Sequence, residues 1–522
     1  MKYEKEKEEH DLRRRNLFVL SLIAVAAVVA GYLLYPDQES EPSFEVQLNP
    51  VEPDDLGVDE WLDDFGGFCD FVEGNYPYLE LKERTHGYNW LDLREGFEER
   101  IRAASDNEGF LLILMEAVEA LQNRHTWIVR PWEVQEYNTQ FGDTFPMNET
   151  FCDEVAEAAN SWYGPYRRVT ASRSNTMFDV RIAYDRGRYI LTDHYASPLS
   201  DVGTEVTKVN GVPMDEAVKT CFEKDYIDWD YSREKPFLWT ISPYDFGGDA
   251  VFTVMDATGL ETNMTFQSSS GSPSFSHLYP RSALTFERYE ELAVGYMYVG
   301  TFDPSTIEPH YHRILTFLEE IEDYDHLIID IRGNTGGAFQ PWIDGIVGPL
   351  LEEDTLHEYY LAYRTDSYVR QFHAVWLDDR VEVPKDHFDY LPPEVQGEGY
   401  EIYNFSSTYA ATHEVDFNGE IILLTDNVVY SAAEGFTNFC KQTGFATIYG
   451  TPSGGDGFFV WPLYYVMPNS KLVITMSSSV SLDRTGRANE EARTQPDVYH
   501  ESPLMDLDEL KDFVLGEIRG SS

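Results

Sequence analysis

The chain has 522 residues, of which 42% are hydrophobic and 25% charged, a balance typical of packed globular proteins and long enough for about three or four domains. Its 92 acidic and 39 basic residues leave a formal net charge of −53 at pH 7. The hydrophobic share argues against a disordered chain. The negative charge repels phosphate backbones and anionic lipid surfaces, and therefore argues against nucleic-acid binding.

The first feature along the chain is an apolar run from Leu17 to Tyr35. As a helix, these 19 residues (35 − 17 + 1) would rise roughly 28 Å and cross a bilayer core. Arginines 13–15 precede the run, so the positive-inside rule predicts a cytoplasmic tail (residues 1–15), a transmembrane signal-anchor (16–35) and an extracytoplasmic remainder at the cell membrane. The alternative is a cleaved signal peptide, but its one A-x-A match, Ala24 to Ala26, lies in the middle of the run.

A linker and a helical domain are expected next. Residues 36–57 are acidic and carry four prolines, a composition typical of an extended linker. A Ser105-Asp106 start signal precedes apolar residues at helical spacing, so residues 58–150 are predicted to form an N-terminal helical domain. The pattern changes to strand-like alternation after His125, and residues 130–175 allow no firm assignment.

Residues 176–268 are predicted to form a compact module made mainly of β-strands. Alternating apolar and polar residues flank the turn Asp185-Arg186-Gly187, and another strand runs into Asn210-Gly211, a strong turn dipeptide. A further hairpin is expected around Thr258-Gly259. Such a module either binds a peptide by adding a strand to an exposed sheet edge or is a structural insert.

Residues 285–522 alternate between strand and helix patterns and form the expected catalytic α/β domain. The expected strands are 294–299, 327–331, 421–425 and 446–449, and the expected helices are 308–321, 342–351 and 431–442. Strands joined by crossover helices predict a largely parallel sheet, with functional groups at the carboxyl ends of its strands.

A glycine-rich turn, Asp330 to Gly337, directly follows one of these strands. Gly336 and Gly337 leave backbone N–H groups uncovered, and such groups can stabilise a developing oxyanion. The alternative is a tight turn that merely requires glycine. The segment matches neither a P-loop nor a dinucleotide-binding motif, which disfavours nucleotide binding.

Ser431 opens a predicted helix and is the candidate nucleophile. Its hydroxyl would lie at the positive end of the helix dipole, beside small residues such as Ala432, whose N–H is a further oxyanion donor. The alternative is a capping box, in which Ser431 and Glu434 satisfy each other's backbone donors without any chemistry. A nucleophilic serine needs a base and an orienting group, for which His125 and Glu490 are candidates, although each alone is more often a packed or solvated residue.

Taken together and in order, these segments resemble the C-terminal processing (tail-specific) and tricorn-core proteases, serine peptidases with a crotonase-like fold. The resemblance covers most of the chain after the apolar run, and it implies a degenerate PDZ-like identity for the β module. The matching segments are Leu121 to Thr126, Gly203 to Pro213, Leu327 to Gly337, Ser431 to Glu434, Gly450 to Gly455, and Glu490 with Pro496-Asp497.

The chain departs from the bacterial tail-specific branch, whose members pair the serine with a lysine in the turn after the nucleophile helix. Here that turn, Ser453 to Asp456, contains no lysine. Lys441 would lie roughly 15 Å along the same helix, whereas Lys471 stays open as an alternative base. The tricorn-like arrangement fits better and implies Ser431 as nucleophile, His125 as base and Glu490 as the group that orients the base.

The resemblance implies a membrane-anchored, extracytoplasmic serine endopeptidase that acts on polypeptides through an acyl-enzyme. The four cysteines are scattered without metal-ligand spacing, so neither a zinc site nor a disulfide framework is predicted, and no cofactor is expected. The alternative is a catalytically inactive protein that binds a peptide or a lipid on the same fold, which the departures at Asn123-Arg124 and Arg493 leave open.

Overall fold

The computed structural model of the chain describes residues 52–521, except 175, 179, 193–202, 271–281, 458–460 and 505. The expected cytoplasmic tail and transmembrane segment, and most of the expected linker, lie outside the described residues. Within the part of the chain that is described, no helix combines the length and the apolar character needed to cross a membrane.

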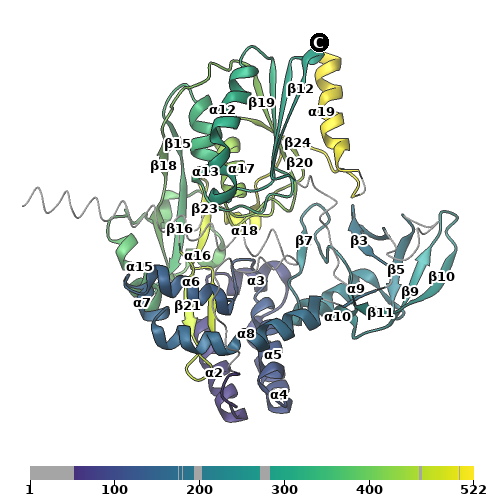
Figure 1. Cartoon of the computed structure of the whole chain (residues 1–522), viewed down its shortest axis with the longest axis vertical. Coiled ribbons are helices and arrows are strands. Elements are labelled where there is room, and N and C mark those ends of the chain that lie inside the picture. The colour runs from purple at the N-terminus through teal and green to yellow at the C-terminus, as the bar shows by residue number, and fades with distance from the viewer. Residues whose placement is uncertain are drawn as a thin grey trace, which may run out of the picture.

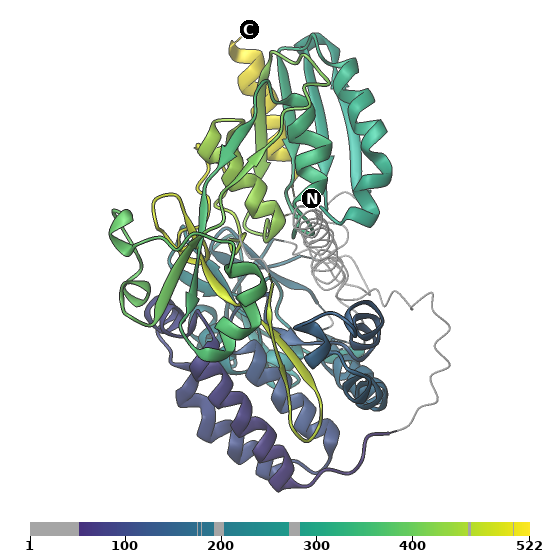
Figure 2. The same cartoon turned by 90° about the vertical axis from the view of Figure 1, so that its left-hand side faces the viewer.

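The N-terminal part of the described chain is helical and lies at one end of the molecule (Figures 1 and 2). Its helices are α2 (Val58–Asn75), α3 (Leu79–His86), α4 (Arg94–Ala103), α5 (Asn107–Glu119), α6 (Pro131–Phe141), α7 (Met147–Thr150) and α8 (Asp153–Ser174). The expected start of α5 is confirmed, because Asp106 Oδ1 accepts the N–H of Gly109 at 2.8 Å as an N-cap. The previously unassigned stretch 130–175 holds α6, α7 and α8.

An antiparallel sheet with the strand order β10-β9-β5-β4-β3 follows the helices. Its strands are β3 (Ile182–Asp185), β4 (Arg188–Leu191), β5 (Glu205–Val209), β9 (Ala250–Met255) and β10 (Glu261–Phe266), with the short β6 (Val212–Pro213) paired to β5. The three expected turns connect paired strands. Asn210 and Gly211 have φ values of 50° and 83°, the left-handed pair that a tight hairpin turn needs and that asparagine and glycine tolerate best.

A six-stranded sheet forms the other end of the molecule, in the order β12-β13-β14-β19-β20-β24. The strands are β12 (Leu284–Tyr289), β13 (Val294–Val299), β14 (His326–Asp330), β19 (Glu420–Thr425), β20 (Thr447–Gly450) and β24 (Val498–Tyr499). All neighbours pair in parallel except β12 with β13, so the expected α/β arrangement is confirmed.

Helices cover both faces of this sheet. Helices α12 (Tyr311–Glu320) and α17 (Ala432–Thr443) pack against one face, where Phe317 and Phe436 share a core with Ile329. Helix α19 (Asp508–Ser521) covers the other face, where Val514 packs with Ile328. Two helix ranges differ from expectation. Residues 308–321 begin with a 3₁₀ turn before α12, and residues 340–350 contain a π-helical turn between two short α-helical turns.

A third group of strands joins the two ends of the molecule. Strand β1 (Trp127–Ile128), directly after His125, pairs with β22 (Val473–Met476), which also pairs with β21 (Leu463–Val466). Strands β16 (Tyr359–Arg364), β17 (Tyr400–Asn404) and β23 (Ser479–Asp483) share one hydrophobic core with the N-terminal helices. This shared core places the loop that carries His125 against the C-terminal half of the chain.

Candidate active site

Ser431 lies at the start of α17 in a strained backbone conformation. Its φ of 56° and ψ of −126° are unusual for a residue other than glycine, and such strain tends to occur where a functional side chain must be held in place. The side chain makes no capping hydrogen bond. Glu434 instead accepts hydrogen bonds from the side chains of Asn489 and Thr494, the latter at 2.6 Å. The capping-box alternative is therefore wrong for this serine.

The Ser431 hydroxyl faces His125. The distance from His125 Nε2 to Ser431 Oγ is 3.1 Å, although the two residues are 306 positions apart in the sequence. His125 is completely buried, and its backbone N–H donates to Asn123 Oδ1 at 3.0 Å, which holds the loop in place. The structure thus brings together two residues that the sequence singled out as nucleophile and base.

The carboxylate on the other side of the imidazole belongs to Asp456. Its Oδ2 lies 2.9 Å from His125 Nδ1. Tyr78 donates to Oδ1 at 2.7 Å, and Asn123, Ser477 and Tyr430 donate to Oδ2 at 2.9, 3.2 and 3.3 Å. Burial by itself raises the pKa of Asp456, but the His125 imidazole and the hydrogen bonds from Asn123 and Tyr78 outweigh it and hold that pKa well below its ordinary value.

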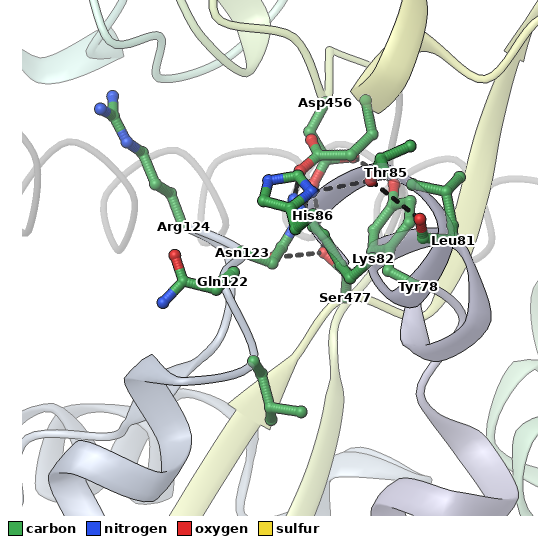
Figure 3. Close-up of polar contacts among 12 residues, drawn as sticks. Tyr78, Leu81, Lys82, Thr85, His86, Gln122, Asn123, Arg124, Asp456 and Ser477 are labelled. Carbon is green, nitrogen blue, oxygen red and sulfur yellow. Dashed lines mark hydrogen bonds and ion pairs between the residues drawn. The ribbon is translucent and has the colours of Figure 1, made fainter. Parts of the chain in front are cut away.

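Glu490 does not occupy the place expected of it. Its Oε1 accepts from Lys82 Nζ at 2.5 Å in a buried ion pair, and its Oε2 is buried without a described hydrogen-bond partner. Burial lowers the pKa of Lys82, against the opposing charge of Glu490. Figure 3 shows Lys82 on helix α3, and Tyr78 directly before this helix, near Asp456, with Arg124 directed away from this group. The expected Ser431–His125–Glu490 order is corrected to Ser431–His125–Asp456, because helix α3 supplies a cation to Glu490.

The three expected oxyanion donors differ in what they contact. The Gly336 N–H donates to Asn334 Oδ1 at 2.8 Å, so this donor is already engaged within its own turn. No hydrogen bond of the Gly337 or Ala432 N–H occurs among the described residues. Gly336 has a φ of 106°, and a Cβ there would lie 2.8 Å from both Ala432 N and Ser431 Cβ. The glycine therefore lets the turn lie directly against the nucleophile.

The lysines that follow Ser431 lie elsewhere. Lys441 pairs with Asp497, and Lys471, the alternative base, pairs with Glu154 Oε1 at 3.0 Å. Lys511 pairs with Asp508 at 3.2 Å. No cluster of histidine, cysteine or acidic side chains suited to a metal ion occurs in the described part of the chain.

Asp456 is the site residue that the sequence argument missed. It lies in Ser453-Gly454-Gly455-Asp456, the loop whose lack of a lysine separates the chain from the bacterial tail-specific branch. An acidic residue directly after two glycines, in the loop that follows the nucleophile helix, was the available signal. Its φ of 47° is uncommon outside glycine but is tolerated by aspartate.

Comparisons with known proteins give one family match and several similar solved structures. Residues 293–500 match the model of peptidase family S41, whose members are serine peptidases. No curated protein sequence matches the chain. Among solved structures, mature CPAF is similar with a TM-score of 0.54 and 14% identity, over 89% of this chain and 98% of that one. CPAF complexed with lactacystin gives a TM-score of 0.52 and 14% identity, over 89% of this chain and 99% of that one.

At 14% identity, the likeness to CPAF concerns the fold. The family match covers the six-stranded sheet from β13 onward, the glycine turn, Ser431, Asp456 and Glu490, whereas His125 lies outside it. Residues 293–500 therefore match peptidase family S41, and the resemblance to the C-terminal processing and tricorn-core proteases is confirmed at the level of that family match.

Proposed function

We propose that the protein is a serine endopeptidase that hydrolyses polypeptides through an acyl-enzyme. The observation that carries this proposal is the run of contacts from Asp456 through His125 to Ser431, with distances of 2.9 and 3.1 Å. Nucleophile, base and orienting carboxylate thus lie within hydrogen-bond reach of one another in the order that this chemistry requires.

In the proposed mechanism, Ser431 Oγ attacks the scissile carbonyl carbon while His125 Nε2 takes the hydroxyl proton. Asp456 accepts the Nδ1–H, which leaves the Nε2 lone pair facing Ser431 and stabilises the imidazolium once it forms. When the tetrahedral intermediate collapses, the C–N bond breaks and the leaving amine takes the proton from Nε2. A water molecule, deprotonated by the same imidazole, then hydrolyses the ester and restores the Ser431 hydroxyl.

The Ala432 and Gly337 N–H groups are the proposed donors to the oxyanion, since Gly336 already donates to Asn334. Backbone donors held by the rigid start of α17 and by the glycine turn require no rearrangement as negative charge develops. Losing one such donor costs about 100- to 1000-fold in rate.

The proposal extends to location and to the β module. Residues 16–35 would anchor the protein in the membrane, with the remainder extracytoplasmic, on the evidence of the apolar run and its flanking charges. The β module would act as a PDZ-like unit that presents peptides, because β10 is an edge strand of its sheet. Protease added to intact cells should degrade the bulk of the chain if this orientation is correct.

A second candidate function is a catalytically silent protein that binds a peptide or a lipid on the same fold. The enclosed site favours it, since Ser431 is only 5% exposed and His125 is fully buried. A fluorophosphonate probe separates the two candidates. Labelling of the wild type but not of Ser431→Ala supports the peptidase, whereas absence of labelling in both favours the binding protein. Because CPAF has been solved in complex with lactacystin, that compound is a useful second probe.

A further inference from the structure

Arg493 is buried near the nucleophile and has no anionic partner among the described residues. It is 9% exposed. Its Nη2 donates to the Tyr231 hydroxyl at 3.0 Å, and its Cζ lies 4.8 Å from the centroid of the Tyr231 ring. Its Nε is buried without a described acceptor. A guanidinium taken out of water normally has a carboxylate or several acceptors around it, so this arrangement needs an explanation.

Three other arginines with little exposure in the described part of the chain have an anionic partner. Arg332 binds Asp330 through two nitrogens, the shorter contact being 2.6 Å, and Arg173 pairs with Glu119. Arg124, close to the same site, pairs with Asp228. Glu490 attracts Arg493 but forms no ion pair with it among the described residues, and its Oε1 accepts from Lys82. Arg493 is therefore a buried cation whose fork of donors is only partly used.

The position of Arg493 relative to the nucleophile follows from Gly455. A Cβ added to Gly455 would lie 2.4 Å from Arg493 Nη1 and 2.7 Å from its Cδ, so the arginine packs directly on this glycine. The carbonyl of the same glycine accepts the N–H of Ser431 at 3.2 Å. One residue thus separates the unpaired guanidinium from the backbone of the proposed nucleophile.

We propose that Arg493 binds a carboxylate of the substrate peptide close to the scissile bond, and so determines specificity. The inference rests on the proposed peptidase function for the identity of the ligand. A planar guanidinium suits a carboxylate because it donates two parallel hydrogen bonds to it. In a chain with a net charge of −53, an anionic ligand needs such a local cation. The carboxylate is either the peptide's free C-terminus or an aspartate or glutamate side chain.

The test uses random hexapeptide libraries and the full-length chain. In one pair of libraries the C-terminus is a carboxylate or a carboxamide. In the other pair the C-terminus is amidated and the acidic positions are Asp and Glu or Asn and Gln. Binding is measured with Ser431→Ala, which cannot turn over, and with Ser431→Ala/Arg493→Gln. The control is Ser431→Ala/Arg84→Gln, which removes an arginine from the nearby surface of α3.

Ser431→Ala should bind the carboxylate member of one pair about 10- to 100-fold more tightly, since a charge-assisted bidentate contact is worth that much. The pair that shows the preference identifies the source of the carboxylate. Arg493→Gln should abolish the preference and Arg84→Gln should keep it. Equal binding within both pairs would overturn the inference, and because it is read on Ser431→Ala it does not depend on whether Arg493→Gln folds.

Hydrolysis of the same libraries by the wild type, followed by mass spectrometry, separates this inference from the proposed function. A carboxylate preference in binding without any cleavage would refute the peptidase function and leave the Arg493 site standing. Cleavage of both members of each pair at equal rates would support the peptidase function and overturn the Arg493 inference. A preference that persists unchanged in a folded Arg493→Gln variant would assign it to another residue and overturn the inference.

Discussion

Two buried acid–base pairs connect the N-terminal helical part of the chain to the region that matches family S41, and they differ in what surrounds the carboxylate. In both, the basic residue comes from the helical part, His125 in one and Lys82 in the other, and the acid comes from residues 293–500. Asp456 accepts hydrogen bonds through both of its oxygens, whereas one oxygen of Glu490 has no described donor.

The difference shows that the groups around a carboxylate decide whether it can orient the base, and that its place in the sequence does not. A buried carboxylate stays ionised only where donors replace its lost hydration, and Tyr78, Asn123 and Ser477 do this for Asp456. Glu490 is compensated by the charge of Lys82 instead. We therefore assign the orienting role to Asp456. The Lys82–Glu490 pair instead holds helix α3 against the region of residues 293–500.

The largest expected effect tests the assignment of the orienting role to Asp456. Asp456→Asn should lower kcat about 10⁴-fold, because the amide favours the wrong tautomer of His125. Glu490→Gln should change kcat of the folded protein by less than about tenfold. Peptide hydrolysis, normalised to folded protein by circular dichroism, measures both. The reverse order of effects would restore Glu490 as the orienting group.

The Lys82–Glu490 pair should matter for stability. Lys82→Met leaves an uncompensated buried carboxylate and should cost about 3–5 kcal/mol of unfolding free energy, and adding Glu490→Leu should recover most of that loss. Denaturant unfolding of the single and double variants measures it. Arg168→Met is the matched control, since this arginine pairs with Glu52 and Glu108 at the surface and should cost less than about 1 kcal/mol.

Two neighbouring tyrosines sharpen the comparison further. Tyr78 donates to Asp456, so Tyr78→Phe should cost about 1.5–3 kcal/mol of stability and also reduce kcat. Tyr76 is equally buried but donates to the carbonyl of Leu121 at 3.0 Å, so Tyr76→Phe should cost about 1 kcal/mol and leave kcat unchanged. Equal rates for the two variants would show that Tyr78 does not support Asp456.

A second buried histidine, His357, gives a prediction on how stability depends on pH. His357 contacts Tyr409 and Asn438, and burial lowers its pKa to about 4 against the opposing Asn438 hydrogen bond. The unfolded chain takes up the proton first, so this contribution to stability is complete above about pH 6.5 and is lost as the pH falls toward 4. Between pH 7 and pH 5 the unfolding free energy should fall by about 2 kcal/mol more in the wild type than in His357→Gln.

Much of the fold followed from local patterns. The strand expected at 294–299 has those bounds, and the other three strands that were expected in this sheet begin and end within one residue of expectation, whereas β24 was not expected. Apolar runs between turn residues identify buried strands, because a strand covered on both faces needs apolar side chains at consecutive positions. Residues 130–175 escaped assignment although α8 buries an apolar stripe at helical spacing, made up of Val155, Ala159, Trp162, Tyr166 and Val169. Gly164-Pro165 interrupts this stripe, and a proline inside a helical pattern is typical of a helix end.

For the site, the sequence by itself determined the chemical groups that carry local signals: a serine at a helix start, a glycine turn after a strand and an isolated histidine. Only the tertiary structure decided which carboxylate meets the histidine, because Asp456 and Glu490 both lie in loops of the same domain. That choice depends on where helix α3 places the Tyr78 hydroxyl and the Lys82 ammonium, 378 and 408 residues away in sequence. The energy of a buried charge is set by neighbours in space, and no local pattern encodes them.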